Sequence, residues 1–173
     1  MLATVIAVWC VGCGSTTDRS SPSTAIPCSA IIDSADDLPE GFEATVLEAV
    51  SFPTDEQPFG VRRGAAGSET DGLTFTKFGL VVHANKEVLL EITDAGGADF
   101  ALDWGISGEP TVGGSITVGP CVGSDSQSKV DDAAWVVFAG GTWLSEPACV
   151  TYRVTSKDDS STHRLGVGTA CET

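Results

Sequence analysis

The sequence AWVVFAGGTWLSEPACVTYRVT, from Ala134 to Thr155, decides the fold class of this chain. It holds two apolar runs on either side of the pair Gly140-Gly141, which we expect to let the chain turn tightly. Within the second run, residues 150–154 alternate apolar with polar side chains, the period of a half-buried β-strand. The tryptophans in this stretch, Trp135 and Trp143, are large apolar side chains that we expect to be buried anchors.

The rest of the chain follows the same pattern. Glycine is frequent, at 20 of 173 residues, and it falls between short apolar runs, with no sustained helical period. We expect strands within residues 42–52, 73–83, 87–93, 100–104, 115–118, 135–139, 142–144, 150–154 and 163–171, with a hairpin turn at 84–86. Residues 42–52 could also form a short helix. The sequence therefore predicts one all-β domain with little helix over residues 28–173, an antiparallel β-sandwich of immunoglobulin-like architecture stapled by disulfides.

Residues 1–12 predict an export signal. The apolar run from Leu2 to Gly12 would span about 16 Å as a helix, against the roughly 30 Å of a bilayer core, so it fits a signal peptide rather than a membrane span. Residues 11–15, VGCGS, resemble the lipobox of bacterial lipoproteins, which implies that Cys13 carries a lipid and becomes the mature N-terminus. Cys10 stands where leucine is usual, and no basic residue follows Met1, so a start upstream of this sequence stays open. The alternative is an ordinary secretory peptide.

Residues 13–27 are rich in Ser, Thr and Pro, and predict a flexible tether between the anchor and the domain. Six cysteines are present. The spacing of Cys10 and Cys13 matches half of a zinc site, but both lie in the apolar leader.

The other four cysteines predict two disulfides and an oxidising compartment. Sequence leaves three pairings open. We favour Cys121–Cys149, which would close the loop carrying the central stretch, and Cys28–Cys171, which would join the two ends of the domain.

Charge and motifs exclude several functions. The net charge of −15 repels phosphate backbones, so we expect no nucleic-acid partner. The two histidines, His83 and His163, lie in no catalytic or metal-binding motif, and we expect both to be solvated. We therefore expect no enzyme activity, no cofactor and no metal. A carboxylate-based hydrolase remains an alternative, because acids are plentiful.

A second alternative is a small-ligand site. Asp99 and Asp103 lie four residues apart near Trp104, and sugar-binding sites combine acids with an aromatic platform. The three residues are candidates to bind a sugar or a cation.

Four segments carry a resemblance: FTKFGLVV (75–82), DWG (103–105), AWVVFAGGTWLSEPACVTYRV (134–154) and LGVGTAC (165–171). Together they resemble a group of small exported proteins and lipoproteins of actinobacteria. The resemblance implies an envelope location and one disulfide-bonded domain, and it brings no assigned activity. The expected function is a non-catalytic interaction or structural module, lipid-anchored on the outer face of the cell membrane, or secreted if Cys13 is not lipidated. Its expected partners are the membrane and another envelope protein or a glycan.

Overall fold

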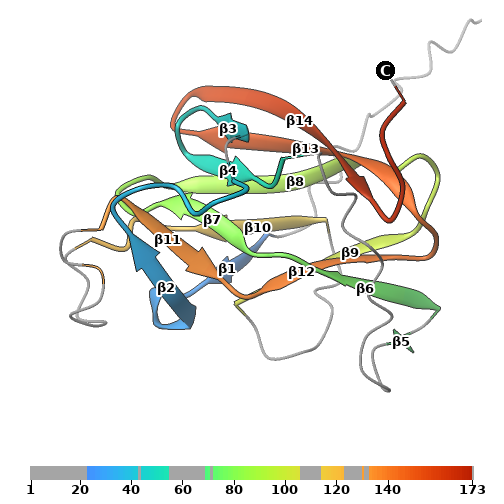
Figure 1. Ribbon diagram of the computed structural model, residues 1–173, viewed down its shortest axis with the longest axis horizontal. Helices are drawn as coiled ribbons and strands as arrows, with labels where there is room; N and C mark the ends of the chain where they lie inside the picture. Colours follow the sequence, from blue (N-terminus) through green and yellow to red (C-terminus); the bar gives the residue numbers. More distant parts are fainter. Residues whose placement is uncertain are drawn as a thin grey trace, which may run out of the picture.

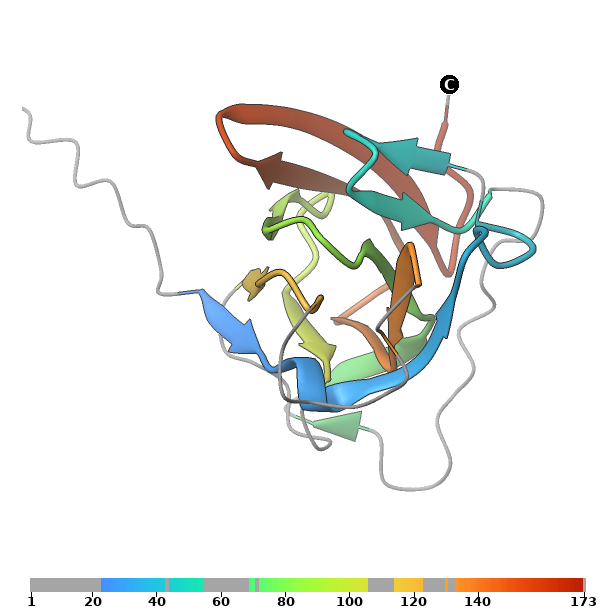
Figure 2. The ribbon, with the colours of Figure 1, turned by 90° about the vertical axis from the view of Figure 1, so that its left-hand side faces the viewer.

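The computed structural model describes residues 23–42, 44–54, 69–70, 72–105, 114–122, 130 and 133–172. Within these ranges the chain is almost wholly β-structure, and the helical part is one short 3-10 turn, η1 (Cys28–Ala30). The strands form three sheets, called A, B and C below, around one interior (Figures 1 and 2). The predicted all-β sandwich, disulfide-bonded and with little helix, is confirmed.

Sheet A contains the two longest strands, which lie along the top of Figure 1. In spatial order its strands are β1 (Thr24–Ile26), β10 (Ser115–Val118), β8 (Val88–Asp94), β13 (Ala148–Ser156) and β14 (Asp159–Val167). The pairing of β1 with β10 is parallel, and the other pairings in sheet A are antiparallel. Because β1 lies inside the stretch predicted as tether, the β-fold starts before the predicted boundary at Cys28.

Sheets B and C share two long, interrupted strands. Sheet B has the order β2 (Ile31–Ala35), β11 (Trp135–Phe138), β7 (Leu80–His83), β4 (Val50–Phe52) and β3 (Ala44–Val46). Sheet C has the order β5 (Glu69–Thr70), β6 (Leu73–Lys77), β12 (Gly140–Leu144) and β9 (Phe100–Trp104). The strand β11 continues into β12, and β6 continues into β7, so each of these two chain segments belongs to both sheets.

The bend between sheets B and C lies at the glycine pair of the central stretch. The backbone N–H of Phe78 donates to the oxygen of Gly140 at 3.0 Å, which carries the pairing across the bend. Gly140 has a φ of +154°, and a Cβ there would lie 1.9 Å from the backbone oxygen of Asp103. No side chain fits at this position. The glycines therefore bend a continuous strand from one sheet to the next, where a tight turn was predicted.

The interior is held together by apolar packing and by a buried polar link between two sheets. Residues of all three sheets form a single hydrophobic cluster, with Phe52, Leu90 and Leu102 among its fully buried members. Within it, the hydroxyls of Thr142 on β12 and Tyr152 on β13 are hydrogen-bonded at 2.8 Å. This bond joins sheet C to sheet A.

Two predicted strands and one predicted hairpin were wrong. Residues 42–52, expected as one strand, contain the hairpin of β3 and β4. Residues 73–83, also expected as one strand, are divided by the bend into β6 and β7. The predicted hairpin at residues 84–86 is absent, because β7 pairs with β4 and β11 while β8 pairs with β10 and β13. The short connection carries the chain from one sheet to another.

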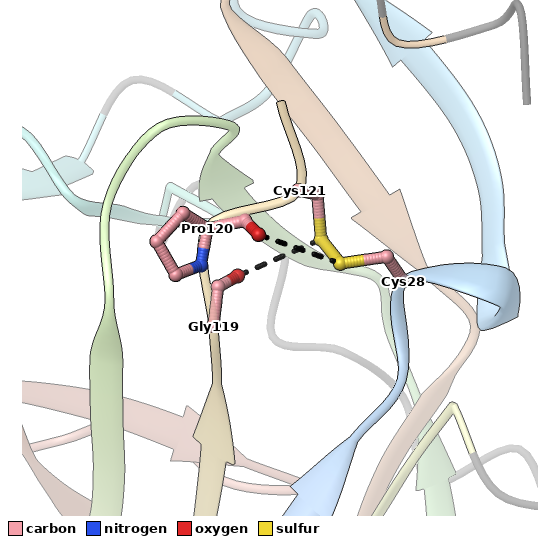
Figure 3. The surroundings of a disulfide bond; sticks show 4 residues. All are labelled: Cys28, Gly119, Pro120 and Cys121. Atoms are coloured by element: carbon pink, nitrogen blue, oxygen red, sulfur yellow. Dashed lines mark hydrogen bonds between the residues drawn. A yellow bond between two sulfur atoms is a disulfide. The ribbon is translucent and has the colours of Figure 1, made fainter. Parts of the chain in front are cut away.

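Both predicted disulfides were wrong. The structure pairs Cys28 with Cys121, at a Cα–Cα distance of 5.5 Å, and Cys149 with Cys171, at 4.9 Å. The first bond follows from the parallel pairing of β1 with β10. Parallel strands end at the same edge of a sheet, so Cys28 and Cys121 leave that edge together, the latter after Gly119 and Pro120 (Figure 3).

The second disulfide is local. Cys149 on β13 lies opposite Gly166 on β14. After β14 the chain turns back at Gly168, which has a φ of +74°, and this turn returns Cys171 to Cys149. The ends of the domain are therefore tied to neighbouring strands, and they are not tied to one another.

Candidate functional site

The structure separates the three residues predicted to bind a ligand. Trp104 is fully buried, and its indole Nε1 donates a hydrogen bond to the backbone oxygen of Phe78 at 3.0 Å. Asp99 is exposed and lies just before β9, whereas Asp103 within β9 is buried. Neighbouring residues of a strand point to opposite faces, so Trp104 points into the core and Asp103 points away from it. The prediction of one cluster of Asp99, Asp103 and Trp104 was therefore wrong.

Asp103 lies instead beside Trp143, on the face of sheet C that is turned away from the hydrophobic core. In the pairing of β9 with β12, Asp103 lies opposite Gly141 and Ala101 lies opposite Trp143, so all four positions share that face. Asp103 and Trp143 are diagonal neighbours, a placement within the reach of an aromatic side chain. Each is only 4% exposed. We call these two residues the Asp103–Trp143 pair.

An aromatic row crosses sheet C at Trp143. Phe75 on β6 lies opposite Trp143, and the two ring centroids are 4.9 Å apart with the rings tilted by 37°. On the other side of Trp143 lies Ala101, which is also buried. Phe75 is half-buried, so this row approaches solvent on the β6 side.

A polar row lies next to it. Lys77 on β6 and Asp103 on β9 lie on either side of Gly141, and the Lys77 side chain is exposed. Gly141 has no side chain, so nothing from β12 stands between them. A Cβ at Gly141 would lie 1.9 Å from the backbone oxygen of Thr76, which keeps this position free of a side chain.

The two members of the pair have unmet hydrogen-bonding capacity. Burial raises the pKa of the Asp103 carboxyl, and the nearby indole N–H of Trp143 lowers the pKa in part by favouring the charged form. Among the described residues, neither Asp103 Oδ1 nor Trp143 Nε1 makes a hydrogen bond of normal geometry, although the indole N–H lies near enough to the carboxyl to affect its pKa. A buried polar group without a partner costs about 1–3 kcal/mol, so this arrangement favours an additional group between them.

The described residues contain no arrangement of a nucleophile with a base. His83 on β7 lies beside Trp135, with ring centroids 5.1 Å apart, while His163 on β14 stacks on Phe52 at 4.6 Å. Both histidines are half-buried, so each is partly solvated. They belong to different sheets and do not meet. Within the described ranges, no three His, Cys, Asp or Glu side chains are grouped as metal ligands.

The two tryptophans of the central stretch differ. Trp143 is buried, as predicted. Trp135 is half-buried on sheet B, and its ring contacts His83. Trp143 therefore offers the buried indole N–H of the candidate site, whereas Trp135 lies on a different sheet and serves as a natural comparison in experiments.

Two shallow hollows lie elsewhere on the described surface. One is formed at the end of sheet C and the other on the outer face of sheet A, where Thr117 Oγ1 donates to Ser23 Oγ at 2.8 Å. Their lining residues are Thr74, Thr76, Leu144, Ser145, Glu146, Pro147 and Val167 for the first, and Ser23, Glu87, Leu89, Thr117, Thr155 and Lys157 for the second. Neither hollow brings together a buried charged group and an unpartnered donor, as the Asp103–Trp143 pair does.

The predicted lipidation residue, Cys13, lies outside the described residues, as does the predicted signal peptide. In the part of the chain that is described, no helix has the length and apolar character needed to cross a bilayer. A scan against protein-family models, a search of curated proteins and a search of solved structures find no match to this chain. The resemblance to exported actinobacterial proteins therefore stays a prediction, and the site is interpreted from its own geometry.

Proposed function

We propose that this chain is a non-catalytic binding module, held on the outer face of a cell membrane by a lipid on Cys13. The observation that carries the proposal is the pair of disulfides, Cys28–Cys121 and Cys149–Cys171, together with the apolar leader that precedes them. Disulfides persist in oxidising compartments, and an apolar run of this length is typical of an export signal.

Two features of the domain support a binding role: its two disulfides and the Asp103–Trp143 pair. Each disulfide ties a chain end to a strand of sheet A, at Cys121 beyond β10 and at Cys149 within β13. Such bonds stabilise a small domain against unfolding outside the cell. The most unusual polar feature, the Asp103–Trp143 pair, has hydrogen-bonding capacity that no described residue uses.

The proposed partners are another envelope protein or a glycan. The net charge of −15 disfavours nucleic acid and anionic lipid surfaces as ligands, so membrane attachment would depend on the lipid rather than on basic side chains. A lipid anchor followed by residues 14–22 would hold the β-fold close to the membrane surface.

Metabolic labelling tests the anchor. Cells expressing the full chain are grown with a labelled fatty acid, and the chain is isolated and compared with a Cys13→Ala variant. We expect label and membrane association in the wild type and loss of both in Cys13→Ala. The matched control is Cys10→Leu in the same leader, which places the usual leucine at that position and should keep its label. An unlabelled wild type, or a labelled Cys13→Ala variant, would contradict the proposed anchor.

A further inference from the structure

The Asp103–Trp143 pair presents an acceptor and a donor side by side. Asp103 Oδ1 can only accept while it is ionised, and Trp143 Nε1 can only donate. Both atoms are buried, and neither has a partner among the described residues. One hydroxyl group satisfies both, because its O–H donates to the carboxylate while its oxygen accepts from the indole N–H.

We propose that the outer face of sheet C is a binding site for a neutral polyhydroxylated ligand, such as a sugar unit of a glycan, with Asp103 and Trp143 holding one of its hydroxyls. This inference deepens the proposed function and rests on it for its setting, since a glycan is one of the partners proposed above.

The aromatic row and the polar row beside the Asp103–Trp143 pair are suited to bind a sugar ring. The half-buried Phe75 packs on the buried Trp143 and brings an aromatic ring toward solvent on the β6 side, and the apolar C–H face of a sugar ring can pack on such a ring. The exposed Lys77 lies across Gly141 from Asp103 and has an ammonium that can donate to a second hydroxyl.

The polar groups of the site are spread over two neighbouring strand pairings, which suits a ring with several hydroxyls. Lys77 and Asp103 lie two strands apart, a separation of about 10 Å between backbones. A single water molecule is the alternative occupant of the Asp103–Trp143 pair, and it would leave the wild type without glycoside binding. A ring with several hydroxyls could use all three groups.

Charged ligands fit poorly. A cation would be attracted to Asp103, but it would leave the Trp143 N–H without an acceptor and would meet the positive charge of Lys77. An anion would accept from Trp143, but it would be repelled by Asp103. The donor and acceptor set therefore selects a neutral group, which separates the sugar from the cation among the ligands considered from sequence.

Calorimetric titration of the full-length chain tests the inference. The probes are the methyl glycosides of glucose, galactose, mannose and N-acetylglucosamine, with calcium chloride and sodium acetate as charged controls. We expect saturable binding of at least one glycoside and no binding of either salt. Asp103→Asn and Trp143→Phe should each weaken that binding at least tenfold, since each alters one hydrogen bond to the same hydroxyl.

Matched variants separate the site from general effects. Asp99→Asn and Trp135→Phe make the same chemical changes outside the pair, and both should bind within twofold of the wild type. Each variant is first checked for cooperative thermal unfolding. If Asp103→Asn does not fold, Trp143→Phe decides the outcome.

The inference is overturned if no glycoside binds the folded wild type, in which case the pair holds water only. It is also overturned if calcium alone binds, or if Trp143→Phe retains full affinity. An unlabelled chain that still binds a glycoside would contradict the lipid anchor but support the binding site. A labelled chain that binds no glycoside would support the lipid anchor but contradict the binding site.

Discussion

The hydroxyl of Tyr152 on β13 is hydrogen-bonded to the hydroxyl of Thr142 on β12, at 2.8 Å, in the middle of the apolar interior. Tyr152 is fully buried, and burial raises the pKa of its hydroxyl, so the group stays protonated in the folded protein. The bond satisfies two polar groups at once and links sheet A to sheet C. It also fixes the central strand β12, which carries Trp143 on its other face.

Removing one member of this bond is expected to destabilise the fold. Tyr152→Phe leaves the Thr142 hydroxyl buried without its partner, and we expect the free energy of unfolding to fall by about 1–3 kcal/mol. Urea unfolding measures the change. The double variant Tyr152→Phe with Thr142→Val should lose less than the sum of the single variants, because no orphaned hydroxyl is left. Strictly additive losses would contradict the assigned bond.

The buried carboxyl predicts a pH dependence of stability. The pKa of Asp103 is raised on folding from a usual value of 3.8, so the folded state retains a proton that the unfolded state has lost. The stabilisation from this group is complete below the unfolded pKa and is lost as the pH rises through the folded pKa. Unfolding at a series of pH values should show this decline in the wild type.

Two variants isolate that contribution. Asp103→Asn cannot ionise, so its stability should vary less with pH across the same window, and its advantage over the wild type should grow as the pH rises. Asp99→Asn removes an exposed carboxyl and should leave the wild-type pH profile unchanged. Identical profiles for Asp103→Asn and the wild type would show that Asp103 is not the group responsible.

The bend between sheets B and C predicts a strict requirement for glycine. Gly140→Ala would place a Cβ 1.9 Å from the backbone oxygen of Asp103, in a backbone conformation that disfavours side chains. We expect a loss of about 3 kcal/mol or more, because backbone atoms must move to relieve the overlap. Thermal unfolding measures it. Gly119→Ala is the control, since a Cβ there meets nothing within 4 Å, and comparable losses in the two variants would contradict the packing at the bend.

The two disulfides are expected to differ in their contribution. The cysteines of the first are separated by 93 residues and those of the second by 22. In the chain-entropy model these loops correspond to about 4–5 and about 3 kcal/mol of stabilisation. Replacing Cys28 and Cys121 by alanine should therefore lower the free energy of unfolding by more than replacing Cys149 and Cys171. Peptide mapping without reduction checks the pairing first, and a linked Cys121–Cys149 peptide would overturn it.

Local patterns in the sequence were informative because they reflect contacts within a strand or across a short turn. The alternation over residues 150–154 places Val150, Tyr152 and Val154 in the core, as observed. Glycine at 140 and 141 indicates a change of chain direction, although the result is a bend between sheets. The strand alternation and the glycine bend each depend on a single segment of the chain and on which of its side chains face water.

The pairing of strands far apart in the sequence could not be predicted from local sequence patterns. The parallel pairing of β1 with β10 joins segments about 90 residues apart, and no local pattern specifies it. The disulfide prediction failed for the same reason, since Cys28 meets Cys121 only because those strands run in the same direction. The short connection at residues 84–86 looked like a hairpin, because a turn between sheets and a turn within a sheet use similar residues.

The candidate site was predicted in part. Asp103 was identified by its residue type, but Trp104 was the wrong aromatic partner, because adjacent residues of one strand must face opposite sides of the sheet. Finding Trp143 instead requires the register of β9 against β12, which sets Ala101 opposite Trp143. That register depends on the packing of the whole domain.

The indole N–H signals of the full-length chain in a proton–nitrogen NMR spectrum report directly on whether Trp143 and Asp103 hold a hydroxyl of a neutral ligand. Trp143→Phe assigns the Trp143 signal by its disappearance. On titration with the methyl glycoside that binds, we expect this signal to move saturably while the signal of Trp104, whose Nε1 is already bonded to Phe78, stays in place. A Trp143 signal that does not move at saturating glycoside would contradict the proposed contact between Trp143 and a ligand hydroxyl.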